Sequence, residues 1–231
     1  MENYLVIGGS SGIGEAIVSL LSKKKESNVL ATYNSKIPFK KDNVQYHNLN
    51  VEIDFDLDFL PEKIDGLVYC PGLINLIPFS RLTEEVLIND FNVQVTGAIK
   101  VIQRCLPRLK KSDKASVILF SSVAVQQGFN FHSLVSISKG AIEGLTRSLA
   151  SELSPKIRVN AIAPSITKTP LTSKLLSSEN KINANAERPP LKRIGDPEDI
   201  AELAKFLISS KSSWITGQII SVDGGLSNLK M

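Results

Sequence analysis

The residues near the amino terminus that point most directly to chemistry are the glycines Gly8, Gly12 and Gly14. The apolar run 4–7 before them predicts a short buried strand, and apolar residues recur at helical spacing over 13–21. Glycine has no Cβ, so the backbone can close on a ligand, and free N–H groups at a helix start point toward an anion. The stretch therefore predicts a phosphate-binding site, although three spaced glycines alone also fit an ordinary turn.

A second strand is predicted at 28–33, and the residues that follow it bear on which nucleotide could bind. In a dinucleotide-binding unit, an acid at the tip of this strand bonds the 2′-hydroxyl of the adenosine ribose. Residues 28–41 contain no Asp or Glu, but they contain Lys36, Lys40 and Lys41. Lysine attracts a 2′-phosphate and an acid repels it, so the sequence favours NADP over NAD. The alternative is that these lysines only solvate a loop.

Predicted strands and helices alternate along the whole chain. Further strands are expected at 43–49, 64–70, 117–120, 157–162 and 218–222, with helices at 83–109, 133–153 and 196–208. This alternation predicts an α/β fold, a doubly wound parallel sheet with helices on both faces, formed by residues 1–231 as a single domain. Ligand sites are then expected at the carboxyl ends of the strands. Residues 165–194 are polar, contain proline and lack periodicity, which predicts a mobile loop or lid.

The composition is that of an ordinary globular protein. Hydrophobic residues make up 42% and charged residues 22% of the 231 positions. The net charge is +4, but the lysines are scattered, so no nucleic-acid partner is expected. Two cysteines give no disulfide framework and fit a reducing compartment. No apolar run is long enough for a membrane span, and the first predicted strand leaves no room for a signal peptide, so a cytoplasmic location is expected.

The chain resembles the classical short-chain dehydrogenase/reductases over nearly its whole length. The matching segments are, in order, the glycine motif 8–14, Ser136-Ile137-Ser138-Lys139-Gly140-Ala141, Arg158-Val159-Asn160-Ala161-Ile162-Ala163-Pro164, Thr169-Pro170, Ile215-Thr216-Gly217-Gln218 and Val222-Asp223-Gly224-Gly225. Ser122, Lys139 and Asn92 fall at the catalytic serine, lysine and helix asparagine of that family. The resemblance implies a Rossmann fold, an NAD(P)-dependent oxidoreductase acting on alcohol or carbonyl groups, and a homotetramer or dimer.

The resemblance also implies a set of cofactor-binding residues, most of them at the carboxyl ends of predicted strands. They are Gly8, Ser10, Ser11, Gly12, Ile13, Gly14, Tyr33, Asn34, Ser35, Asn50, Val51, Cys70, Pro71, Gly72, Lys139, Pro164, Ser165, Ile166 and Thr167. No metal is expected, because the alternating acids at 54–58 lack the glycine and terminal Glu of a calcium loop. The substrate is expected to be a small molecule, but the composition of the lid does not encode which one.

The chain departs from the family at the catalytic tyrosine. The residue four positions before Lys139 is Val135, and residues 131–138 contain no tyrosine. In the family, this tyrosine gives a proton to the carbonyl oxygen as hydride arrives, the lysine lowers its pKa and holds the ribose, and the serine bonds the substrate oxygen. Valine has no proton to give. Nearby, Ile7, 69–72 and Ser165 also differ from the usual family residues.

Three hypotheses follow from the missing tyrosine. The first is an NADP-dependent oxidoreductase that uses another proton donor. The candidates are Ser122, Ser136, His132 and a water held near Lys139, whereas Tyr69 is expected to serve packing. The second is a nucleotide-binding or partner subunit without redox turnover. The third is a lyase or dehydratase reaction on the same scaffold. We favour the first, because Ser122, Asn92 and Lys139 are present.

Overall fold

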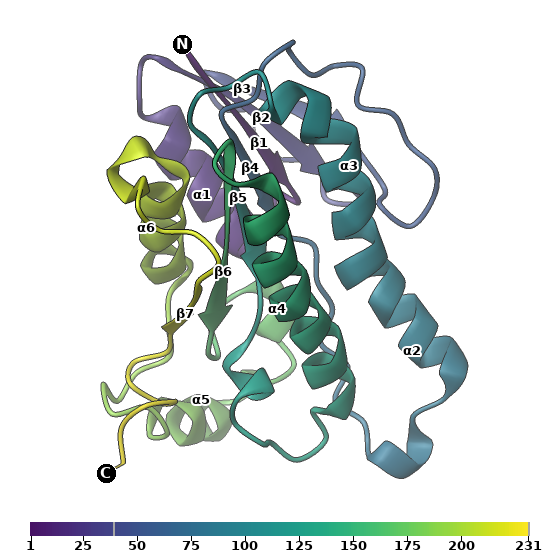
Figure 1. The fold of residues 1–231 in the computed structure, drawn as a ribbon. Coiled ribbons are helices and arrows are strands. Elements are labelled where there is room, and N and C mark those ends of the chain that lie inside the picture. The colour runs from purple at the N-terminus through teal and green to yellow at the C-terminus, as the bar shows by residue number, and fades with distance from the viewer. Residues whose placement is uncertain (39, 231) are drawn as a thin grey trace.

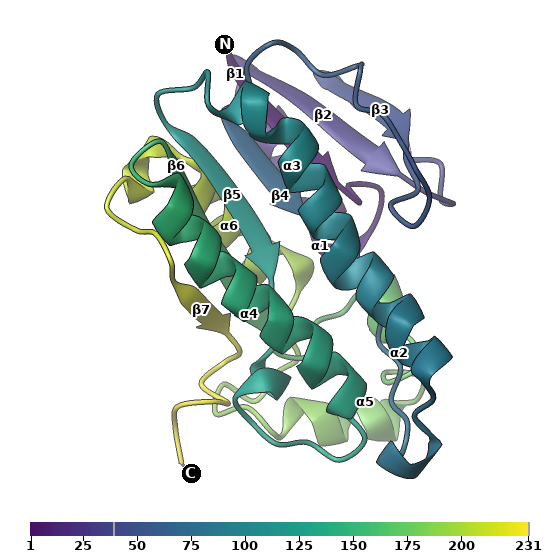
Figure 2. The ribbon, with the colours of Figure 1, turned by 45° about the vertical axis from the view of Figure 1, so that its right-hand side comes forward.

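Seven parallel strands form one sheet in the order β3-β2-β1-β4-β5-β6-β7 (Figure 2). The computed structural model describes residues 1–38 and 40–230. The strands are β1 (Glu2–Ile7), β2 (Ser27–Tyr33), β3 (Val44–Asn48), β4 (Gly66–Tyr69), β5 (Ala115–Phe120), β6 (Ile157–Pro164) and β7 (Ile219–Val222). The chain begins at β1 in the middle, winds to one edge, returns to β4 and then winds to the other edge. This is the predicted doubly wound, Rossmann-type sheet, with its switch point between β1 and β4.

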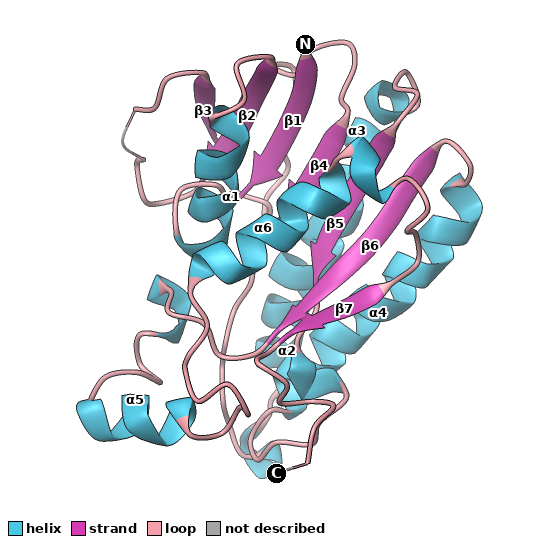
Figure 3. Cartoon of the chain, turned by 90° about the vertical axis from the view of Figure 1, so that its left-hand side faces the viewer, coloured by secondary structure: helices cyan, strands magenta, loops and turns pink. Residues whose placement is uncertain are grey.

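The helices form a layer on each face of the sheet. They are α1 (Gly12–Ser22), α2 (Glu84–Phe91), α3 (Gly97–Leu109), α4 (Ser133–Leu153), α5 (Glu179–Ala186) and α6 (Pro197–Ile208). Helices α1 and α6 cover one face, and α3 and α4 cover the other (Figures 1 and 3). All six residues of β5 are buried because both of its faces are covered, which explains its uninterrupted apolar sequence. All the strands point toward the end of the molecule where α5 lies (Figure 3).

The helix predicted at 83–109 contains a π-helical segment, Asn92–Thr96, between α2 and α3. Helix α2 begins after Thr83, as predicted, because the Thr83 hydroxyl accepts a hydrogen bond from the Val86 amide at 3.3 Å. A π segment displaces the regular i to i−4 bonds, and the Tyr69 hydroxyl donates to the Val93 carbonyl there at 2.5 Å. The expectation that Tyr69 serves packing is consistent with this contact.

The segment 165–194 is more regular than expected. It contains a 3₁₀ turn, Pro170–Thr172, and helix α5, none of whose residues is buried. Helix α5 begins at Ser178, whose hydroxyl accepts from the Lys181 amide at 3.3 Å. The prediction of irregular structure was wrong here because a helix that buries no face shows no apolar periodicity. The next helix, α6, begins where predicted, with the Asp196 amide donating to the Asp199 carboxylate at 2.8 Å.

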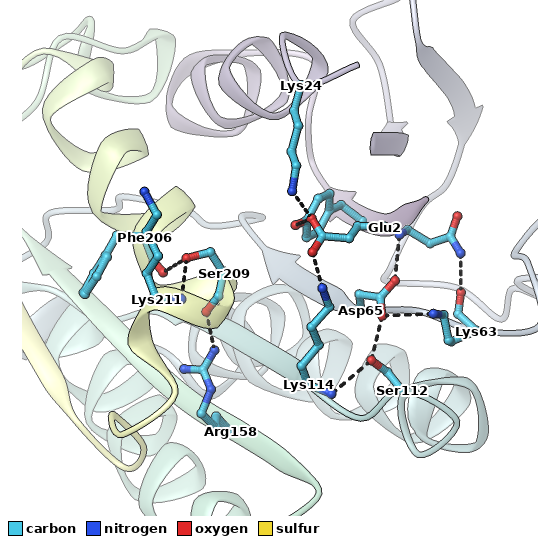
Figure 4. Close-up of polar contacts among 12 residues, drawn as sticks. Glu2, Lys24, Lys63, Asp65, Ser112, Lys114, Arg158, Phe206, Ser209 and Lys211 are labelled. Carbon is cyan, nitrogen blue, oxygen red and sulfur yellow. Dashed lines mark hydrogen bonds and ion pairs between the residues drawn. The ribbon is translucent and has the colours of Figure 1, made fainter. Parts of the chain in front are cut away.

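A polar network joins the amino ends of the strands (Figure 4). It lies at the opposite end of the sheet from α5 (Figure 3). The Asp65 carboxylate, just before β4, accepts from the Asn3 amide at 2.9 Å and the Ser112 hydroxyl at 2.7 Å. Glu2 at the start of β1 pairs with Lys24 and with Lys114. These contacts join four segments of the chain, at residues 2–3, 24, 65 and 112–114, and lie away from the carboxyl ends of the strands.

A pair of glycine substitutions tests the packing of the two layers. A Cβ at Gly66 in β4 would overlap the Ile208 side chain of α6 and lie 2.8 Å from the Tyr4 ring. We therefore expect Gly66→Ala to lower the free energy of unfolding by about 1–3 kcal/mol. Gly144 lies exposed in α4 with nothing near its missing Cβ, so Gly144→Ala should raise it by about 0.5–1 kcal/mol. Urea unfolding measures both, and a loss at Gly144 or no change at Gly66 would contradict the packing described.

Candidate active site

A cavity of about 820 Å³ lies at the carboxyl ends of the strands. Its volume is within the range of small-molecule sites. Of the expected cofactor-binding residues, all except Tyr33 line it. The neighbouring Thr32 lines the cavity instead, and its hydroxyl accepts from the Gly8 amide at 3.1 Å. The inclusion of Tyr33 was wrong by one residue, because adjacent side chains of a strand point to opposite faces.

The turn between β1 and α1 has the shape that the glycine spacing predicts. Gly8 has a φ of +75°, which side chains with a Cβ rarely adopt. A Cβ at Gly14 would overlap the Gly8 carbonyl oxygen, so the turn closes only with glycine there. The Ser11 side chain makes no capping hydrogen bond, which leaves the first N–H groups of α1 open to a ligand. A tight turn with open N–H groups at a helix start fits a pyrophosphate.

The cavity continues past the end of β2, where Asn34, Ser35 and Lys36 line it. Lys36 and Lys41 each lie 3.9 Å from the Glu15 carboxylate. Two cations thus share the Glu15 carboxylate, and Lys36 is the one of them that lines the cavity. The acid of this end of the cavity is Glu52, which follows β3 rather than β2.

Ser122, Val135 and Lys139 come together in the cavity wall. The Ser122 hydroxyl oxygen accepts from the Ala124 amide at 3.2 Å, and its hydrogen stays free to donate. Val135 is buried and presents an apolar wall. Burial lowers the pKa of the Lys139 ammonium to about 8, while the charge of Asp90 opposes that shift. The serine and lysine are thus both placed to contact a ligand.

The expectation that Asn92 faces the site is contradicted. Asn92 is exposed and lies outside the cavity lining, whereas Gln94 lines the cavity and is buried. Residues two apart in a helix point to nearly opposite sides, so one of them faces inward and the other outward. Gln94 was missed because residue type alone was used to choose Asn92. Its sequence signal is the polar pair Asp90 and Gln94, which lie four apart and share a helix face.

The other candidate proton donors differ in where their side chains lie. The Ser136 hydroxyl donates to the Ala124 carbonyl at 2.8 Å, and Ser136 does not line the cavity. His132 does line it; its Nδ1 lies 2.8 Å from the Asn130 carbonyl oxygen, which favours the tautomer that donates there. Of the candidate donors, Ser122 and His132 therefore line the cavity together with Lys139.

In the part of the chain that the structure describes, no three His, Cys, Asp or Glu side chains gather as a metal site. No helix within residues 1–38 and 40–230 has both the length and the apolar character to span a bilayer.

Comparisons with known proteins agree with this geometry. A family model described as Enoyl-(Acyl carrier protein) reductase matches residues 8–227. The chain is 34% identical over 242 residues to the 3-oxoacyl-(acyl-carrier-protein) reductase FabG of Thermotoga maritima, covering 96% of each chain. It is also 34% identical over 241 residues to a tropinone reductase homolog of Arabidopsis thaliana, covering 97% of this chain and 92% of that one. A short chain dehydrogenase family protein from Francisella tularensis superposes with a TM-score of 0.88 at 26% identity, covering 99% of this chain and 100% of that one.

Proposed function

Because the chain belongs to the short-chain dehydrogenase/reductase family of oxidoreductases, we propose that it reduces a small carbonyl compound with NADPH. The observation that carries this proposal is the single cavity that joins the glycine turn to Ser122 and Lys139. A nucleotide held by the turn would extend along the strand ends toward these two side chains. The two relatives named above are a reductase and a homolog of a reductase, which supports a carbonyl substrate.

The residues fit a nicotinamide dinucleotide phosphate. The open N–H groups of α1 would hold the pyrophosphate, and Lys36 would face the 2′-phosphate. Bound NADPH supplies a hydride, and this chain must supply orientation and a proton. The free hydroxyl hydrogen of Ser122 would donate to the substrate oxygen and polarise the carbonyl. The pKa of the Lys139 ammonium, lowered by burial to about 8, leaves it mostly protonated at pH 7.

The strongest alternative is a nucleotide-binding subunit without redox turnover, and Val135 is the observation that favours it. Its buried side chain lies in the cavity wall where the family places a proton donor, and valine has no proton to donate.

The free thiols Cys70 and Cys105 support a reducing compartment, and we infer a cytoplasmic location. A homotetramer or dimer, built on the two long helices and the C-terminal segment, remains a proposal.

The preference for NADPH is tested at Lys36. Lys36→Ala should weaken NADPH binding about 5- to 10-fold, because a cation facing the 2′-phosphate is lost. NADH binding should be unchanged, since NADH lacks that phosphate. Lys23→Ala is the matched control, because Lys23 is exposed at the far end of α1 and does not line the cavity. Calorimetric titration measures the affinity of the wild type and both variants for each nucleotide. An equal loss of affinity for NADPH and NADH in Lys36→Ala would argue against a contact between Lys36 and the 2′-phosphate.

The role of Ser122 is tested against its neighbour Ser136. Ser122→Ala should lower kcat/KM for carbonyl reduction by at least about 10-fold, because a donor to the reacting oxygen is removed. Ser136→Ala should have little effect on turnover, because its hydroxyl donates to the Ala124 carbonyl and Ser136 itself does not line the cavity. Steady-state NADPH oxidation measures both variants. A larger loss for Ser136→Ala would exclude Ser122 as the polarising group.

The effect of having valine at position 135, where the family has a tyrosine, is tested by restoring the tyrosine. Val135→Tyr should raise the rate of carbonyl reduction about 10-fold or more, since a positioned acid contributes about 10²–10⁴. Val135→Phe is the control, because it adds the ring without the hydroxyl and should bring no gain. The measurement is NADPH oxidation at saturating nucleotide. Equal rates for the tyrosine variant and the wild type would show that the site is reshaped beyond this residue.

A further inference from the structure

A buried polar cluster lies beside Lys139, formed by Asp90, Gln94 and Ser138. The Asp90 Oδ1 atom accepts from the Gln94 Nε2 at 2.6 Å and from the Ser138 hydroxyl at 2.6 Å. All three residues are at most 1% exposed. Asp90 and Gln94 belong to the helix that contains the π segment, and Ser138 immediately precedes Lys139 in α4. The cluster therefore joins that helix to the backbone beside the lysine.

Two acceptors of this cluster have no donor among the described residues, the Asp90 Oδ2 and the Gln94 Oε1. Leaving a buried acceptor without a hydrogen-bond donor destabilises the fold, and more so when the acceptor is charged. The ammonium of Lys139 has three N–H donors. The Gln94 Oε1 and the Lys139 Nζ both border Gly72, because a Cβ built there would lie 3.5 Å from the first and 3.6 Å from the second. The unpaired Gln94 Oε1 and the Lys139 ammonium thus border the same residue, and the charge of Asp90 acts on that ammonium.

The charges around Lys139 single out Asp90. The titratable groups near the lysine are Asp90 on α2, Cys70 after β4, His132 before α4 and Glu143 one turn further along α4. Glu143 is already bound by the Ser121 hydroxyl at 2.9 Å and by Arg147 at 3.2 Å. Burial raises the pKa of the Cys70 thiol to about 12, so it is neutral at pH 7. Asp90 is therefore the carboxylate that has an unpaired oxygen, Oδ2, and whose charge stabilises the Lys139 ammonium.

We propose that Asp90 is a positioning residue that keeps Lys139 protonated beside Val135, so that Lys139 itself gives the proton that the family takes from tyrosine. The inference rests on the proposed carbonyl reduction. In this step, hydride adds to the carbonyl carbon, NADPH becomes NADP⁺, and the N–H bond of Lys139 breaks as the O–H bond of the alcohol forms. The neutral amine then takes a proton from solvent through the cavity, and the charge of Asp90 favours its return to ammonium.

The first test follows Lys139 in the protein without nucleotide. Reductive methylation with ¹³C-formaldehyde gives each lysine an NMR signal, and the signal lost in Lys139→Arg identifies Lys139. We expect it to titrate near pH 8 in the wild type. In Asp90→Asn it should titrate at least about one pH unit lower, because a negative charge that favours the ammonium is gone. Asp113→Asn, which neutralises an exposed carboxylate, is the control and should not move it. If the Lys139 signal titrates at the same pH in Asp90→Asn as in the wild type, the proposal is overturned.

The second test is the pH dependence of turnover. The ammonium is the donating form, so kcat should fall as pH rises through the pKa of Lys139, and this fall should begin at lower pH in Asp90→Asn. Asp113→Asn is the control and should keep the wild-type profile. A profile that moves in His132→Ala and not in Asp90→Asn overturns the donor role of Lys139. If Asp90→Asn does not fold, Asp90→Ser removes the same charge and carries the same expectation.

The two tests separate this inference from the proposed function. NADPH binding without reduction of any carbonyl compound, in the wild type and in Val135→Tyr alike, would overturn the proposed reduction and the donor role with it. If the wild type reduces carbonyl compounds but the pKa of Lys139 is the same in Asp90→Asn, the inference is overturned and the proposed function stands.

Discussion

The site depends on one half-buried cation, the ammonium of Lys139. Lys139 lines a cavity closed on one side by Val135, and desolvation lowers its pKa to about 8. A charge withdrawn from water is costly, so its neighbours must compensate. The compensation comes from α2 through Asp90, whose charge favours the ammonium. Ser138 ties that carboxylate to the turn of α4 that holds the lysine. The packing of these two helices therefore sets the electrostatics of the site.

The doubly wound sheet gives this arrangement a rigid frame. Strands buried on both faces end at one edge, and there they present the glycine turn, the Ser122 turn and the segment after β6 to one cavity. Polar contacts such as those of Glu2 and Asp65 join the amino ends of the strands instead. Stability and chemistry are thus placed at opposite ends of the sheet, which lets residues such as Val135 differ without disturbing the core.

Much of this could be predicted from sequence where the signal is local. The glycine turn, the cap at Thr83 and the cap at Asp196 each depend on a few neighbouring residues, and all are confirmed. Whether Asn92 points into the site depends on which side of its helix packs inward. Choosing a residue by its type gives no information about that side. Helix α5 buries no side chain, so it has no apolar period to read.

The role of Asp90 depends on long-range contacts and was beyond sequence reasoning. A carboxylate within a predicted helix is normally taken as solvent-exposed, and the partners of this one are 4 and 48 residues away. The proposed preference for NADPH rests on the glycine turn and on Lys36 in the cavity lining. Family membership, shown by the comparisons, supports the oxidoreductase assignment and does not distinguish the two nucleotides.

The most direct test of the account follows the hydride itself. NADPH carrying deuterium at the transferred position of C4 is incubated with the wild type and a panel of aldehydes and ketones, and each alcohol is analysed by mass spectrometry. Val135→Tyr, assayed in parallel, shows which compounds of the panel can be substrates. The account predicts one deuterium in the same alcohols from both proteins, at a lower rate from the wild type. Labelled alcohol from Val135→Tyr with none from the wild type would contradict it, because the natural site would then bind without transferring hydride.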